Sequence, residues 1–188
     1  MTGTAAPLDA AGIVDRVLSS APTLGDSRLV CVDGPAGSGK TTLAASIRRA
    51  VPREVSCRVL HLDDLYPGWD GLRAGVEHVG RSVVAPFAAG RPGRYRRYDW
   101  VAQRPGVWVD VPLVDLLVIE GVGAGASAYA AAITFLVWVE AAEADRLARG
   151  LARDGLATRE QFVRWMAAEA PYLSGEGTRS RADLILAT

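Results

Sequence analysis

Lysine is almost absent from this chain of 188 residues. Lys40 is the only one, and the other basic side chains among the 21 are all arginine. A strong net charge is also absent, because 21 acidic side chains balance the basic ones. No overall field draws such a protein to nucleic acid or to a membrane surface, and we expect neither as a partner. Without a second lysine, the chain cannot carry the Asn/Thr-Lys-x-Asp motif with which switch GTPases bind guanine.

Long hydrophobic runs and cysteines are scarce as well. No stretch of 18 residues is uninterruptedly apolar, so we expect no membrane span. The opening MTGTAAPLDAAG has neither the basic nor the apolar part of a secretory signal, which favours a cytoplasmic protein. Cys31 and Cys57 each lie in or beside an apolar run, and neither has a Cys-x-x-Cys partner. We therefore expect two reduced, buried thiols.

Apolar and charged residues make up 49% and 22% of the chain, which is typical of one globular domain spanning 1–188. Apolar runs predict five strands, at 28–33, 58–63, 115–121, 133–140 and 182–187. Helical patterns lie at 8–20, after the first strand up to about 50, and at 81–90, 142–154 and 159–172. The last helix begins with Thr158 and Gln161 at capping-box spacing.

Strands that alternate with helices predict a parallel five-stranded sheet with helices on both faces, a three-layer α/β sandwich. Ligands of such folds bind beyond the carboxyl ends of the strands. A glycine-rich loop follows the first strand here. Carboxylates follow the next three, namely Asp63 and Asp64, then Glu120, then Glu140. A phosphate cradle and several carboxylates are thus predicted at one edge.

The loop GPAGSGKT, residues 34–41, matches the P-loop pattern G-x-x-x-x-G-K-[ST] between a strand and a helix. Its glycines let backbone amides surround phosphates, Lys40 reaches the outer phosphates as a compact charge, and the Thr41 hydroxyl binds Mg²⁺. Planar arginine is a poor substitute there, which explains the single lysine. The sequence thus predicts a P-loop NTPase fold with ATP and Mg²⁺ as cofactors. The predicted nucleotide-binding residues are Gly34, Pro35, Ala36, Gly37, Ser38, Gly39, Lys40, Thr41 and Thr42.

The segment HLDDLYPGWDGL, residues 61–72, separates the candidate activities. One carboxylate of Asp63 and Asp64 suits proton removal from a substrate hydroxyl, and another helps to hold the water shell of Mg²⁺. Tyr66 and Asp70 are placed to bind a polar substrate. Helix capping or a solvated turn is the alternative for the acidic pair. A second glycine-rich stretch, 121–125, resembles a dinucleotide fingerprint only loosely, so close packing beside the nucleotide is the better interpretation.

These motifs resemble the uridine kinase and phosphoribulokinase branch of the P-loop kinases over about residues 28–187. Members carry Asp-x-Phe-Tyr after the second strand, here Asp63-Asp64-Leu65-Tyr66, and Tyr-Asp-Phe in a substrate-side insertion, here Tyr98-Asp99-Trp100. Their third strand ends in Glu-Gly, here Glu120-Gly121. A later helix of the type R-L-x-R-x-x-x-R-D corresponds to 146–154, and the last strand begins with Ala-Asp, here Ala182-Asp183.

The resemblance implies that Asp63 is the general base. It also implies that Tyr66 and Tyr98 line the substrate pocket within an insertion at 64–112, and that Arg149 and Arg153 belong to a lid at 142–158. The predicted substrate residues are Tyr66, Asp70, Arg97, Tyr98 and Asp99, and the predicted metal residues are Thr41, Asp63 and Glu120. The chain departs from uridine kinases where their base-binding histidine is replaced by Gln103.

Arginines that fall on one face of the 142–154 helix support the lid independently, because planar guanidinium groups suit phosphate oxygens. A solvated, salt-bridged face is the alternative. Four arginines in the predicted loop 90–100 point either to an anionic substrate or to a solvated loop. We expect His61 in the core, His78 on the surface, and Trp165 and Met166 in the core.

The sequence therefore predicts an ATP-dependent kinase that phosphorylates a hydroxyl of a small metabolite, with a nucleoside as the leading acceptor. A nucleoside monophosphate kinase and a sugar-phosphate kinase are the alternatives within the same class. A non-catalytic ATP-binding accessory protein is the alternative from another class. The expected partner is the small-molecule acceptor, and the sequence gives no prediction of oligomeric state.

Overall fold

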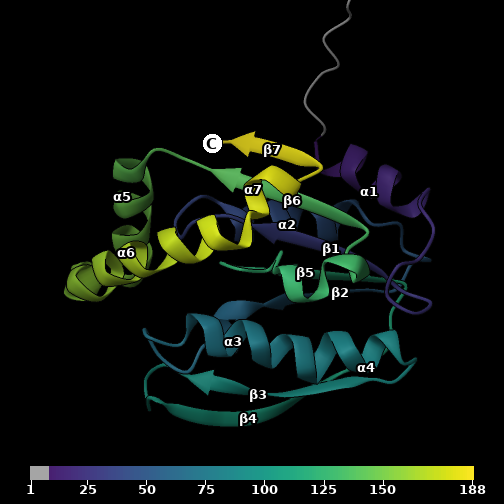
Figure 1. The fold of residues 1–188 in the computed structure, drawn as a ribbon, viewed down its shortest axis with the longest axis horizontal. Helices are drawn as coiled ribbons and strands as arrows, with labels where there is room; N and C mark the ends of the chain where they lie inside the picture. The colour runs from purple at the N-terminus through teal and green to yellow at the C-terminus, as the bar shows by residue number, and fades with distance from the viewer. Residues whose placement is uncertain (1–8) are drawn as a thin grey trace, which may run out of the picture.

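A five-stranded parallel sheet lies at the centre of the computed structural model, which describes residues 9–188 (Figure 1). The strand order is β2-β5-β1-β6-β7. The strands are β1 (Arg28–Asp33), β2 (Cys57–His61), β5 (Leu116–Glu120), β6 (Phe135–Glu140) and β7 (Leu184–Ala187). This sheet confirms the predicted α/β fold class. Leu8, the first residue of the predicted N-terminal helix, lies outside the described residues.

Helices cover both faces of the sheet, as its alternating buried side chains require. Val30 and Val32 of β1 pack in the core beneath α1 and α2, whereas Leu29 and Cys31 pack in the opposite core with α3, α4 and α6. These helices are α1 (Ala10–Leu18), α2 (Lys40–Ala50), α3 (Leu72–Val79), α4 (Ala85–Ala88) and α6 (Arg159–Glu176). The remaining helical segments are η1 (Leu62–Asp64), η2 (Gly80–Val84), η3 (Ser127–Ala132), α5 (Glu143–Asp154), η4 (Leu156–Thr158) and α7 (Thr178–Arg181).

The second strand differs from the prediction in length and burial. It lies at the edge of the sheet, is only partly buried, and ends at His61 instead of 63. The chain then turns into the short 3₁₀ helix η1. This early turn matters for the site, because it carries Asp63 out of the sheet.

Helix α3 was not predicted, because it is short and lies among the glycines that gave its segment the look of a loop. The structure shows why glycine is tolerated inside the helix. A Cβ on Gly75 would lie 2.5 Å from the Tyr66 ring. Packing of the helix against that ring outweighs the helix-propensity cost of glycine, about 1 kcal/mol.

The predicted arginine-rich loop at 90–100 is wrong, because this segment forms the first strand of a β-hairpin. Strand β3 (Gly93–Asp99) pairs antiparallel with β4 (Arg104–Val111), with a bulge between Arg96 and Tyr98. Tyr95 is buried, whereas Arg94 and Arg96 on either side are exposed. This alternation was present in the sequence, but arginines on the outer face concealed it.

The structure confirms some of the smaller predictions and contradicts others. The Thr158 side chain donates to the Gly155 carbonyl at 2.8 Å, so the capping box with Gln161 is not formed. Both cysteines are free thiols, but only Cys31 is buried and Cys57 is half-buried. Across residues 9–188, no helix is both long and apolar enough to cross a membrane.

Candidate active site

The P-loop, Gly34 to Thr41, connects the end of β1 to the start of α2. Gly37 and Gly39 have φ angles of 77° and 95°, a left-handed conformation that glycine adopts without steric cost. A side chain on Gly37 would also collide with the Arg146 carbonyl oxygen of α5. No side chain among residues 9–188 caps the start of α2, so its first amides remain available to an anion.

Two polar side chains inside this loop fit a bound phosphate. Lys40 is only 7% exposed, and its Nζ donates to the Pro35 carbonyl at 2.8 Å. Ser38 is completely buried, and its Oγ has no hydrogen-bond partner within the described part of the chain. An unpaired buried hydroxyl is costly, and a ligand oxygen would relieve that cost. The loop therefore fits the nucleotide phosphates that the sequence predicts.

Asp33 organises the floor beneath the loop, a role that sequence reasoning missed. Its fully buried carboxylate accepts hydrogen bonds from the amides of Gly34 at 2.6 Å, Gly123 at 2.7 Å and Gly125 at 3.0 Å. Burial raises the pKa of Asp33, and the three amides oppose that rise. The second glycine-rich stretch, 121–125, is thus tied to the P-loop, in agreement with the expected close packing. A carboxylate at the last position of a strand before the loop was the available signal.

Thr41, Glu120 and His61 meet at the carboxyl end of the sheet. The Thr41 hydroxyl donates to Oε1 of the buried Glu120 at 3.1 Å, and His61 Nδ1 lies 2.6 Å from the same oxygen. The hydrogen bond to Glu120 raises the pKa of His61. His61 is 44% exposed, so the prediction of a core histidine is wrong. His78 is partly buried and not fully on the surface.

The Thr41–Glu120 pair fits the predicted magnesium position, because hydroxyl and carboxylate oxygens are the donors that Mg²⁺ prefers. Within residues 9–188, no three His, Cys, Asp or Glu side chains form a metal-binding group. In phosphate-transferring enzymes, one or two protein ligands usually hold Mg²⁺ together with water and substrate oxygens.

Asp63 lies at the same edge, on η1. Its side chain is 57% exposed, and an Oδ atom lies 3.9 Å from a guanidinium nitrogen of Arg153. Although much of the side chain is exposed, the protein around it and then the charge of Glu120 raise the pKa of Asp63. Its neighbour Asp64 instead accepts a hydrogen bond from the Tyr95 hydroxyl at 3.3 Å. Of the acidic pair, only Asp63 therefore has its carboxylate beside Arg153, one of the predicted lid arginines.

The three arginines of α5 have separate contacts. Arg153 pairs with Asp63 and, at 2.7 Å, with Asp154. Arg149 donates to the Thr188 hydroxyl at 2.8 Å, and Thr188 donates to the Ser38 carbonyl at 3.0 Å, which links this arginine to the P-loop. Both predicted lid arginines thus lie near the site. The third, Arg146, contacts the loop directly.

Aromatic side chains form a group next to Asp63. Trp100 donates its indole N–H to the Asp63 carbonyl at 2.9 Å and contacts the ring of Tyr98, with centroids 5.2 Å apart. Trp69 lies 5.4 Å from Trp100 and 6.3 Å from Trp165. Trp69 and Trp100 were not among the predicted substrate residues. These four rings, Trp69, Tyr98, Trp100 and Trp165, are called the aromatic group below.

Tyr66 and Asp99, two of the predicted substrate residues, have structural roles. Tyr66 is 1% exposed, and its hydroxyl donates to the Val122 carbonyl at 2.8 Å, which leaves it no free donor toward a substrate. Asp99 accepts from the amides of Val101 and Ala102 and thereby closes the turn of the hairpin. The substrate role of these two residues stays a prediction.

Four other residues of the predicted site lie as follows. Asp70 and Arg97 are exposed, so their substrate role stays a prediction. Glu140, expected among the converging carboxylates, instead forms an ion pair with Arg179 at 2.8 Å. Thr42 is exposed on the first turn of α2.

Comparisons with known proteins agree with this geometry at the level of the fold. No family model and no curated protein matches the sequence. A solved structure described as a possible uridine kinase from Bacillus stearothermophilus is 22% identical, with a TM-score of 0.70 over 94% of this chain and 96% of that one.

Two further solved structures give the same result. A provisionally assigned fructose transport system kinase from Silicibacter sp. TM1040 is 18% identical, with a TM-score of 0.60 over 96% of this chain and 99% of that one. A D-glycerate 3-kinase from Cryptococcus neoformans is 13% identical, with a TM-score of 0.53 over 87% and 84%. This chain therefore has the P-loop kinase fold, and the predicted resemblance is confirmed at that level.

Proposed function

We propose that this protein is a Mg²⁺·ATP-dependent kinase that transfers the γ-phosphate to a hydroxyl of a small metabolite, with a nucleoside as the leading acceptor. The observation that carries the proposal is the place of Asp63. Its exposed carboxylate lies 3.9 Å from Arg153 of the predicted lid helix. It lies at the same edge of the sheet as the P-loop, since His61, two residues earlier, and Thr41 of the P-loop both contact Glu120. A protein that only binds ATP needs no such base.

The phosphates would be held by the amides of the P-loop and by Lys40. Thr41 and Glu120 would hold Mg²⁺, which neutralises charge on the phosphates when it is bound. Asp63 would accept the proton of the acceptor hydroxyl while the new O–P bond forms and the bond to ADP breaks. Lys40 and Arg153 would face the negative charge on the transferred group, so catalysis rests on positioning and electrostatics.

The aromatic group supports an acceptor with a flat ring. Trp100 and Tyr98 lie beside Asp63, and rings of this kind bind planar ligands by stacking and edge contacts. Two of the hairpin arginines favour a neutral acceptor over an anionic one. Arg94 and Arg96 lie over the outer Trp108 ring, at 4.9 and 5.8 Å from its centroid. We also propose a cytoplasmic location for this kinase, as predicted from the sequence.

Coupled ADP release with Mg²⁺·ATP tests the function directly. The acceptors would be nucleosides, nucleoside monophosphates, sugar phosphates, fructose and glycerate, and mass spectrometry would identify the product. We expect one nucleoside to stimulate turnover far above the background ATPase rate. Stimulation only by anionic acceptors would overturn the nucleoside assignment. If ATP binds but no hydroxyl compound is phosphorylated, the kinase assignment falls.

A further inference from the structure

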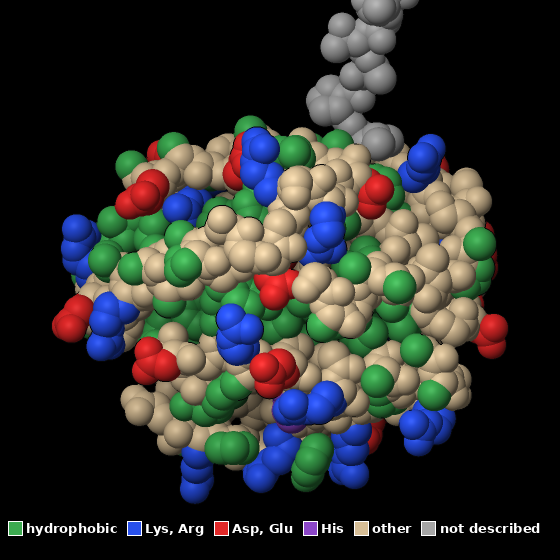
Figure 2. All heavy atoms as spheres, in the orientation of Figure 1, with side chains coloured by type: hydrophobic (Ala, Val, Ile, Leu, Met, Phe, Trp, Pro, Cys, Tyr) green, Lys and Arg blue, Asp and Glu red, His purple; other side chains and the backbone are tan. Residues whose placement is uncertain are grey.

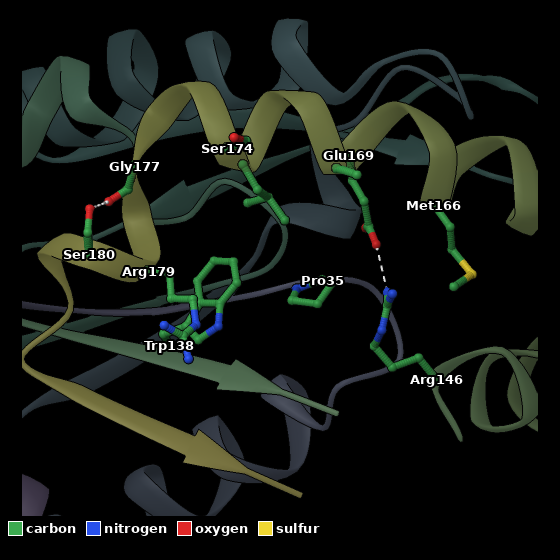
Figure 3. A pocket seen from close by; sticks show the side chains of 11 residues that line it. Pro35, Trp138, Arg146, Met166, Glu169, Ser174, Gly177, Arg179 and Ser180 are labelled. Atoms are coloured by element: carbon green, nitrogen blue, oxygen red, sulfur yellow. Dashed lines mark hydrogen bonds and ion pairs between the residues drawn. The ribbon is translucent and has the colours of Figure 1, made fainter. Parts of the chain in front are cut away.

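Helix α6 places a buried carboxylate directly under the P-loop. Glu169 is 1% exposed, and its Oε2 accepts the backbone N–H of Ala36 at 2.9 Å and the Trp165 indole N–H at 3.0 Å. In Figure 3 the side chain extends from α6 toward Pro35 and Arg146. The amide of Ala36 is thus held by a side chain 133 residues away in the sequence.

Arg146 of α5 completes the contact from the other side. One guanidinium nitrogen donates to Glu169 Oε1 at 2.9 Å and to the Ala36 carbonyl at 3.2 Å. Both peptide groups of Ala36 are therefore held, one by each helix. The next residue, Gly37, lies so close to the Arg146 carbonyl that no side chain fits there. The tip of the loop, Pro35 to Gly37, therefore packs against α5 and α6.

Stability alone does not account for this arrangement. Burial raises the pKa of Glu169, and the Ala36 amide, Lys40 and Arg146 only oppose that rise. A carboxyl whose pKa is higher in the folded state is stabilising only at low pH, so its ionised form costs stability near neutral pH. Apolar side chains of similar size often stabilise a protein core at least as much as a buried ion pair does.

We propose that Glu169 and Arg146 are a positioning pair that holds the tip of the P-loop in the conformation that receives the nucleotide phosphates. This inference rests on the nucleotide binding within the proposed function and adds two residues to it. The pair also joins the loop to the lid, because Arg149 and Arg153 follow Arg146 on the same helix. Neither residue touches the reacting atoms.

Isothermal titration with Mg·ADP, with Glu169→Ala as the main variant, tests the pair. We expect its affinity for Mg·ADP to fall about tenfold or more, the size of a lost charge-assisted hydrogen bond. Glu169→Gln keeps an oxygen for the Ala36 amide and should recover most of that loss. Glu160→Ala, an exposed glutamate on the same helix, is the matched control and should bind as the wild type does.

Kinetics and a double variant separate positioning from folding. In Glu169→Ala the KM for ATP should rise while the KM for the acceptor stays unchanged. Arg146→Met should also weaken Mg·ADP binding, and the double variant should lose less than the sum of the two losses, because the two side chains act together. Chemical denaturation of each variant measures stability separately.

Wild-type Mg·ADP affinity in a folded Glu169→Ala protein would overturn the proposal, whether or not the stability of the variant is reduced. If Glu169→Ala does not fold, unchanged affinity in Arg146→Met is the contradicting result. Loss of Mg·ADP affinity in a protein that phosphorylates no acceptor would leave the positioning pair intact and reject the kinase assignment.

Discussion

The P-loop edge and the β3–β4 hairpin use polar side chains in opposite ways. At the P-loop edge, Asp33, Glu120 and Glu169 are buried, and each is held by amides or side chains from distant segments. On the hairpin, Arg94 and Arg96 face solvent over an exposed Trp108. Figure 2 shows this difference as a row of basic side chains along the lower edge, where the hairpin lies.

This difference separates the side chains that packing constrains, at the P-loop edge, from those that can vary, on the hairpin. A buried carboxylate without its partners costs several kcal/mol, so each partner at the P-loop edge is constrained. Within residues 9–188, five of the eight large hydrophobic side chains that are exposed lie between 100 and 113, in or next to the hairpin. Exposed side chains can change at little cost in stability. The side chains at the P-loop edge are therefore rigidly specified, whereas those of the hairpin can vary.

Loss of Asp63 should have the largest effect. Asp63→Ala should lower kcat by about 10²–10⁴-fold while Mg·ATP still binds, because only the general base is removed. Since the pKa of Asp63 is raised, wild-type turnover should fall as the pH drops toward a value above that of an ordinary aspartate. Near neutral pH the ionised form of such a group costs stability, so Asp63→Asn should not lower Tm. Asp64→Asn is the control, and equal losses in both variants would remove Asp63 from its role.

Replacement of the single lysine should come next. Lys40→Ala should reduce kcat by about 10²–10³-fold, as expected when one preplaced charge on the phosphates is lost, and should weaken ATP binding as well. Lys40→Arg should rescue little, because a planar guanidinium does not fit a site built for a compact ammonium. Steady-state kinetics at varied ATP check both variants. Normal kinetics in either one would contradict the P-loop assignment.

Asp33→Asn tests the buried floor of the P-loop. One carboxylate oxygen becomes an NH₂ group that faces a backbone N–H donor, so the free energy of unfolding should fall by about 2–3 kcal/mol. Guanidinium denaturation measures this change. Asp26→Asn replaces an exposed aspartate and should stay within about 0.5 kcal/mol of the wild type. A small effect at Asp33 would show that this edge is as tolerant as the hairpin.

Two tryptophans of the hairpin segment provide the finest comparison. Trp100 touches Asp63 and Tyr98, whereas Trp108 lies on the outer face under Arg94. Trp100→Ala should raise the acceptor KM by about three- to tenfold, the size of one aromatic contact. Trp108→Ala should leave it unchanged. The same result for both variants would mean that the aromatic group does not bind the acceptor.

The sequence predicted the sheet and the P-loop because both depend on local pattern. Continuous apolar runs indicated β1, β5 and β6, and the eight-residue loop motif needed only its flanking strand and helix. The edge strand β2 was less clear, since its partial burial weakens the apolar signal. Helix α3 and the hairpin were missed because glycines and arginines occupied positions that only tertiary contacts explain.

The site was predictable where one residue does one chemical task, as with Lys40 and Thr41. It was not predictable where residues meet across the fold. Glu169 looked like any polar residue of an amphipathic helix, yet it holds an amide of the P-loop. Tyr66 matched a family motif, but its hydroxyl is used by the Val122 carbonyl. Pairings of this kind depend on chain packing, which a single sequence does not record.

The single lysine also gives this protein one specific site for chemical labelling. An acylating analogue of ATP that reacts with primary amines would meet only one side-chain amine in the whole chain, that of Lys40. This amine is 7% exposed and hydrogen-bonded to the Pro35 carbonyl. General amine reagents should therefore react slowly with it, and a nucleotide-directed one quickly. A single modified peptide in a mass spectrum would then report occupancy of the P-loop without any knowledge of the acceptor.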